Sequence, residues 1–131
     1  MTITVSWHDD EHTITRLDFK GNVTINELFD AWREELLLMR SVDHPVYSLN
    51  VFENYHMMLG HISVNKLVSF IRDNRSDNLQ MTIQITEGTS LRRMLATLAA
   101  LMPHDVRIVP TIADAEAIIT AHRNTIQRKA S

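Results

Sequence analysis

The chain has 131 residues, of which 44% are hydrophobic, and this size fits one domain with its own core. Its formal net charge of −3 excludes the broad basic surface that nucleic acids and anionic membranes attract. The chain has no cysteine, which excludes disulfides, thiolate catalysis and cysteine-ligated metals. Such a composition is typical of the reducing cytoplasm.

Neither a targeting segment nor a membrane span is indicated. Residues 1–7 lack a basic region followed by an apolar stretch, so we expect no signal peptide. Apolar runs such as residues 98–102 are far shorter than the roughly 20 residues that cross a bilayer. We therefore expect a soluble, cytoplasmic protein with a single domain over residues 1–131.

The first half of the chain changes between a period of two and helical periodicity. The pattern predicts strands over 2–7, 12–19 and 46–52, a helix over 24–40 and a loop over 53–62. The first two strands are joined by a short polar turn, so they should pair as an antiparallel hairpin. Thr24 and Glu27 have the spacing of a capping box at the start of the helix.

In the second half, each predicted strand is again followed by a helix. We expect a helix from Ser63, a strand over 79–86, a helix over 89–102, a strand over 106–109 and a helix from Thr111, which has a second box-like cap with Asp114. The core should lie within about residues 2–122. The polar segment 123–131 should fray.

This order, ββαβαβαβα, predicts an α/β fold with a five-stranded mixed sheet and four helices. Strands that are buried on both faces usually read as continuous apolar runs. Here they alternate instead, most clearly over residues 79–86. We therefore expect one well-packed face and one face that is polar, partly open or used against a partner.

Three stretches, WHDDEHTI at residues 7–14, MRSVDHPV at 39–46 and ADAEAII at 113–119, accompany this order. Together they resemble the SpoIIAA-like (STAS-like) fold, and in particular single-domain bacterial STAS/SEC14-like proteins. The resemblance covers residues 7–122. It implies a non-enzymatic regulatory or protein-interaction module, with a protein partner or a second copy in a homodimer.

Anti-sigma-factor antagonists in the STAS family carry a phosphorylated serine at the start of the second helix. By position, this resemblance implies Ser63 as a phosphoacceptor. The neighbouring residues, His61-Ile62-Ser63-Val64, lack the acid and the glycine of the family's motif. The chain is therefore not a standard phosphoserine antagonist, and Ser63 is also explained as a helix N-cap.

The segment 53–62 follows the end of a predicted strand, where open α/β sheets bind ligands. Its adaptable contact residues make it a candidate partner-binding or ligand-binding loop: Tyr55, His56, Met57, Met58 and His61. Alternatively, it folds onto the core. His56 and His61, with His44 nearby, could also form a metal site, although their spacing is not that of a zinc-protease helix. No cofactor is predicted.

Residues 88–93 begin a predicted helix, whose free amides favour anions. Thr89, Ser90, Arg92 and Arg93 are therefore candidates for binding a phosphate or an acidic partner. The alternative is that Glu87 and solvent screen the two arginines. The pattern of a phosphate-binding P-loop is absent.

No catalytic constellation is visible. The chain has no Gly-x-Ser-x-Gly elbow, and we expect Glu34 and Glu35 on the solvent side of their helix. Three hypotheses follow: a STAS-like interaction module, a carrier or sensor of a small apolar or amphiphilic ligand, and a histidine-based metal protein or enzyme. Lining residues for the second hypothesis would be Trp32, Met57, Met58 and Phe70.

Overall fold

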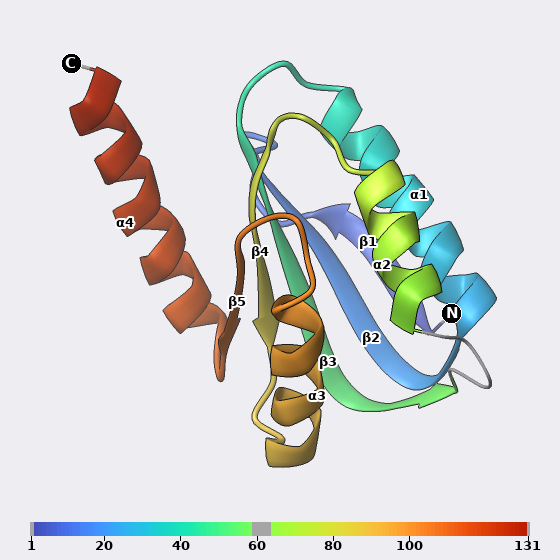
Figure 1. Ribbon diagram of the computed structural model, residues 1–131. Helices are drawn as coiled ribbons and strands as arrows, with labels where there is room; N and C mark the ends of the chain where they lie inside the picture. The colour runs from blue at the N-terminus through green and yellow to red at the C-terminus, as the bar shows by residue number, and fades with distance from the viewer. Residues whose placement is uncertain (1, 59–63, 131) are drawn as a thin grey trace.

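The computed structural model describes residues 2–58 and 64–130 (Figure 1). Within these ranges, nine elements follow one another in the predicted order: β1 (Ile3–Trp7), β2 (Ile14–Thr24), α1 (Ile25–Arg40), β3 (Val46–Met58), α2 (Val64–Asp73), β4 (Leu79–Ile85), α3 (Thr89–Ala99), β5 (Val106–Val109) and α4 (Ile112–Ala130). The predicted α/β fold with a five-stranded mixed sheet is confirmed. No helix in the described part of the chain is long and apolar enough to span a membrane.

The strands stand in the sheet in the order in which they occur along the chain. β1 is antiparallel to β2, and each later strand is parallel to the one before it. Right-handed crossovers that always step in one direction leave their helices on the same face. Accordingly α1, α2 and α3 border one face, while α4 follows the last strand and packs on the opposite face (Figure 1).

Each face of the sheet has its own core. Beneath α4, the apolar positions of β3 and β4 are buried, and Leu49 and Ile83 belong to the cluster that contains Ala115 and Ile119. On the other face, Leu17, Phe19 and Val23 of β2 pack with Leu28 and Ala31 of α1. The buried apolar side chains of β3 and β4 therefore pack under α4.

The alternate positions of β3 and β4 carry polar side chains, as the alternation in the sequence indicated. Ser48, Asn50 and Thr82 are nonetheless buried, because they lie under the three helices rather than in solvent. The polar face of the sheet is thus an enclosed surface. Polar side chains therefore lie between the sheet and the three helices, where apolar side chains are usual.

The segment 53–58 is not a loop, contrary to the prediction. It continues β3, and Tyr55, Met57 and Met58 are paired with β2. β2 itself runs to Thr24 instead of residue 19, passing through Gly21 at φ +71°. Main-chain hydrogen bonding between the two strands extends both of them beyond their predicted ends. The periodicity of the side chains does not reveal such pairing.

The described part of the segment 123–131, which we expected to fray, is helical, because α4 continues to Ala130. Its last residues have high helix propensity, so the helix needs no apolar contact there. Arg123 also lies 5.3 Å from the centre of the Tyr47 ring and donates to the Thr13 hydroxyl. These contacts hold the middle of α4 against the sheet.

Both predicted helix caps are present. The Thr24 hydroxyl accepts from the Glu27 amide at 3.3 Å, and the Thr111 hydroxyl accepts from the Asp114 amide at 3.1 Å. In each case the carboxylate accepts from the threonine hydroxyl instead of reaching the cap amide. The caps therefore set both helix starts locally.

Asn78 ties the connection after α1 to the start of β4. Its side-chain nitrogen donates to the carbonyl oxygens of Met39 at 2.9 Å, Val42 at 3.3 Å and His44 at 3.0 Å. Its side-chain oxygen accepts from the Ser76 hydroxyl at 2.5 Å. One amide thereby satisfies main-chain groups that neither a helix nor a strand can pair.

Candidate functional site

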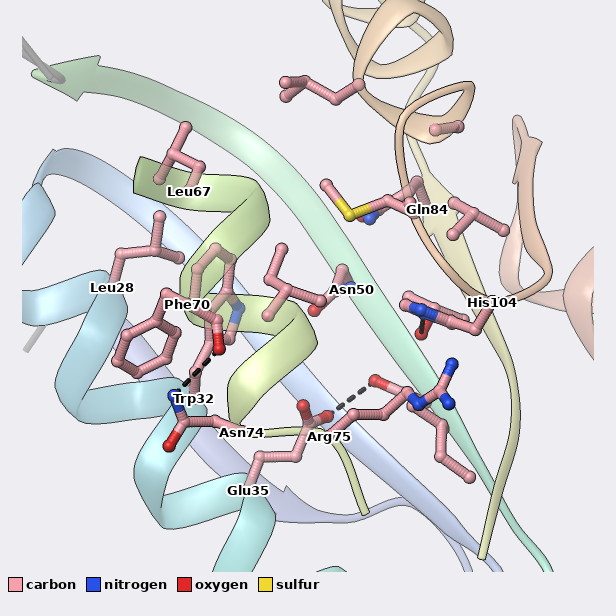
Figure 2. A pocket seen from close by; sticks show the side chains of 18 of the residues that line it. Leu28, Trp32, Glu35, Asn50, Leu67, Phe70, Asn74, Arg75, Gln84 and His104 are labelled. Carbon is pink, nitrogen blue, oxygen red and sulfur yellow. Dashed lines mark hydrogen bonds between the residues drawn. The ribbon is translucent and has the colours of Figure 1, made fainter. Parts of the chain in front are cut away.

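A pocket of about 150 Å³ lies between the sheet and the three helices on its polar face (Figure 2). Its floor is formed by β3 and β4, one wall by α1 and α2, and the other by α3 and the segment that leads to β5. Most of the lining is apolar, and it includes Phe19 and Phe52 of the sheet. The lining residues that matter for the chemistry of the pocket are Trp32, Glu35, Ser48, Asn50, Phe70, Arg75, Thr82, Gln84, Ala99 and His104.

Aromatic side chains build the wall from α1 and α2. Phe70 stacks on Phe29 with the ring centres 4.4 Å apart, and Trp32 lies 5.6 Å from Phe70. These contacts hold α2 on α1 and leave Trp32 and Phe70 in the lining (Figure 2). The wall is therefore apolar and braced by its own packing.

The floor consists of two polar rows that the strand register creates. Ser48 is paired with Thr82, and two positions further along, Asn50 is paired with Gln84. Neighbouring strands lie about 4.8 Å apart, so the side chains of each row stand close together. The parallel register, rather than nearness in the chain, assembles this floor.

Glu35 reaches the first row from α1. Its Oε2 accepts from the Ser48 hydroxyl at 2.6 Å and from the Thr15 hydroxyl at 2.9 Å. Both hydrogen bonds go to the same oxygen, and Oε1 accepts none from the described residues. Burial raises the pKa of the Glu35 carboxyl, and the two hydroxyl donors oppose that rise only in part.

His104 meets the other end of the first row, where its Nε2 lies 2.9 Å from the Thr82 hydroxyl. Burial lowers the pKa of His104, and the positive charge of Arg75 lowers it further, which favours a neutral imidazole. Arg75 itself is exposed at the rim and donates to the Pro103 carbonyl at 3.1 Å.

Three buried polar atoms of the pocket have no hydrogen-bond partner among the described residues. They are Asn50 Oδ1, Gln84 Oε1 and His104 Nδ1. Leaving such a group unpaired costs about 1–3 kcal/mol, so buried polar atoms are nearly always satisfied by protein, water or ligand. In this pocket, a water molecule or a bound ligand would therefore have to complete their hydrogen bonding.

The raised pKa of Glu35 leads to a prediction about stability. Between the ordinary value near 4.5 and the raised value, the folded protein keeps a proton that the unfolded chain has lost. The free energy of unfolding should therefore fall as the pH rises through this window. In Glu35→Gln the slope should be flatter by up to about 1.4 kcal/mol per pH unit.

Urea unfolding at a series of pH values from about 4.5 to 8 measures this slope. Glu34→Gln is the matched control, since Glu34 is the neighbouring acid on α1 and is exposed. Equal slopes for the wild type and Glu35→Gln would contradict the prediction.

The structure brings together only part of the predicted site. Trp32 and Phe70 line the pocket as expected. The backbone of Tyr55, His56, Met57 and Met58 belongs to β3, but their side chains are not among those described. His61 and Ser63 lie outside the described residues altogether.

The other candidates lie away from the pocket. Thr89, Ser90, Arg92 and Arg93 are exposed on α3, and none of them lines it. Gly88 caps that helix without a side-chain hydrogen bond. Among the side chains that the structure describes, no group of three acidic or histidine residues is placed to hold a metal ion. The Nδ1 atom of His44 lies 3.1 Å from the Pro45 carbonyl oxygen.

Glu35 is the main residue that sequence reasoning missed. The prediction that it faces solvent was wrong, because its carboxyl is enclosed against β2 and β3. A signal was present: Glu35 follows Leu28 by seven positions and Ala31 by four, which places it on the apolar stripe of α1. An acid in such a stripe is a candidate for a special role.

Comparison of the chain with protein-family models, curated proteins and solved structures finds no match. Evidence for function therefore comes from the geometry and chemistry of the pocket itself.

Proposed function

We propose that this protein binds a small, largely apolar molecule that carries a polar group, and acts as its carrier or sensor. The observation that supports this proposal most directly is the set of unpaired polar atoms on the floor of the pocket. A binding site that is mostly apolar, with a few convergent polar groups, is the common form of a small-molecule site.

The size of the pocket limits the ligand. Its volume of about 150 Å³ is close to that of a protein cavity known to hold benzene. The Trp32 and Phe70 side chains supply a matching aromatic surface. We infer that the enclosed part of the ligand is one ring or a short branched chain, with any longer part leaving past the rim.

The order ββαβαβαβα also supports the proposed SpoIIAA-like resemblance, and with it a regulatory role in which a protein partner or a second copy responds to the ligand. The absence of cysteine supports a cytoplasmic setting. A sensor of this kind would signal through its helices, because α1, α2 and α3 all contribute to the pocket wall.

A fluorescence titration tests ligand binding. Trp32 lines the pocket, whereas Trp7 stacks on His12 elsewhere, so Trp7→Phe leaves Trp32 as the single reporter. Titration with 2-phenylethanol, a neutral ring with one hydroxyl, should change the Trp32 emission with saturation. A wild type that shows no saturable change with this probe would count against the proposal.

A variant that fills the pocket gives the decisive comparison. Ala99 is a small residue of the lining on α3, and Ala99→Phe should weaken binding of 2-phenylethanol by about tenfold or more, because the added ring occupies the space of the ligand. Ala96→Phe is the control, since Ala96 is exposed on the same helix. Equal weakening by both substitutions would contradict binding at this site.

A further inference from the structure

Building on the proposed function, we propose that the pocket selects a protonated aryl-alkyl amine, with Glu35 as its counter-ion. The ring would occupy the space beside Trp32 and Phe70, and the ammonium group would lie over the polar floor. If the proposed function fails, this inference fails with it.

The first argument is the kind of hydrogen bond that remains unmade. Asn50 Oδ1 and Gln84 Oε1 are buried amide oxygens, which only accept, and neither has a donor from the described residues. His104 Nδ1 donates or accepts according to its tautomer, and the hydrogen bonds that Glu35 accepts from Ser48 and Thr15 both go to Oε2. A ligand that meets the two amide oxygens must bring donors. An ammonium group carries three N–H donors and no acceptor, so its chemistry complements this floor.

The second argument is where these acceptors lie. Ser48 holds the Glu35 carboxylate above the first polar row, and Asn50 and Gln84 form the next row, two residues further along each strand. Two residues of a strand span about 6.6 Å, so a nitrogen midway between the rows would lie about 3.3 Å from each along the strand. One nitrogen between the rows could therefore be within reach of both.

The third argument is charge. Of the described lining residues, Glu35 is the buried acid, whereas Arg75 carries its positive charge at the exposed rim, where water screens it. An ammonium ligand beside Glu35 would favour the ionised carboxylate, which burial alone disfavours. A ligand carboxylate or phosphate would bring further acceptors and a second negative charge to Glu35. A cation would instead replace the water that Glu35 has lost on burial.

The aromatic wall favours the same class of ligand. The faces of aromatic rings attract cations, and the Phe70 ring already has one, because the Arg33 guanidinium carbon lies 5.2 Å from its centre. The Trp32 ring therefore offers the aromatic face for the ligand. Trp32 and Phe70 lie on the α1–α2 wall from which Glu35 also projects (Figure 2). In an aryl-alkyl amine, a short alkyl chain joins the ring, which would contact the apolar wall, to the ammonium group, which would donate to the polar floor.

The test compares three probes that share one ring: 2-phenylethylamine, 2-phenylethanol and phenylacetate. Isothermal titration at pH 7.5, where the amine is protonated, should show the amine binding about tenfold or more tightly than the alcohol, with phenylacetate weakest. Glu35→Gln should reduce the affinity for the amine to that for the alcohol. Glu34→Gln should leave all three affinities unchanged.

Each outcome decides between the two proposals. Equal affinity for the amine and the alcohol, with both lost in Ala99→Phe, would overturn the choice of a cation and leave the binding pocket in place. Tighter binding of phenylacetate would overturn it in favour of an anion at Arg75. Binding of none of the three would overturn both proposals. The wild-type comparison does not depend on whether Glu35→Gln folds.

Discussion

Leu49→Ala should lower the free energy of unfolding by about 3–4 kcal/mol, one of the two largest effects expected for a single substitution in this chain. Leu49 lies in the first half of β3, the central strand of the sheet, and has no exposed surface. It packs against Ile83 and against Ala115 and Ile119 of α4. Since a rigid sheet forms its base, the cavity left by alanine cannot collapse.

Chemical denaturation followed by circular dichroism measures this loss, and the midpoint of thermal unfolding should fall by about 10 °C or more. Leu37→Ala is the matched control, because Leu37 is 70% exposed on α1. Its effect should stay within about 0.5 kcal/mol. A loss at Leu49 as small as that at Leu37 would show that α4 does not cover the sheet as described.

Asn78→Asp should cost about 3 kcal/mol although the two side chains have the same shape. The nitrogen of Asn78 faces the carbonyl oxygens of Met39, Val42 and His44, and aspartate would place a second oxygen there. Every one of these contacts would change from a hydrogen bond to a repulsion between acceptors. The connection between α1 and β3 would then lose its attachment to β4.

Because the change is isosteric, Asn124→Asp controls for the added charge, since Asn124 is exposed on α4. Urea unfolding at pH 7 should separate the two variants clearly. At a pH low enough to protonate the introduced acid, part of the loss at position 78 should be recovered. Equal stability of the two variants at pH 7 would contradict the role given to Asn78.

Parts of the fold could be predicted from the sequence because local interactions determine them. The alternation over residues 79–86 predicted β4 to within one residue, and the Thr24 and Thr111 caps marked the starts of α1 and α4. Residues 53–58 were predicted wrongly for the opposite reason. Their strand exists through pairing with β2, a segment more than thirty residues earlier in the chain.

Only part of the site could be predicted from the sequence. Sequence reasoning named Trp32 and Phe70 as lining for a ligand, and it expected a polar face on the sheet. It did not find Glu35. The position of Glu35 on the apolar stripe of α1 indicates that its carboxyl points inward, but it does not indicate which residues the carboxyl contacts. Ser48 and Thr15 are those residues, and no pattern along the chain connects them to position 35.

The order of elements and the alternation of the strands were determined by the sequence itself, since both arise from residues a few positions apart. Tertiary structure alone decided that the polar positions would be enclosed rather than exposed. Crossovers that step in one direction place three helices over that face, and the β3–β4 register sets Asn50 beside Gln84. The pocket exists because residues far apart in the chain, from Glu35 to His104, converge there.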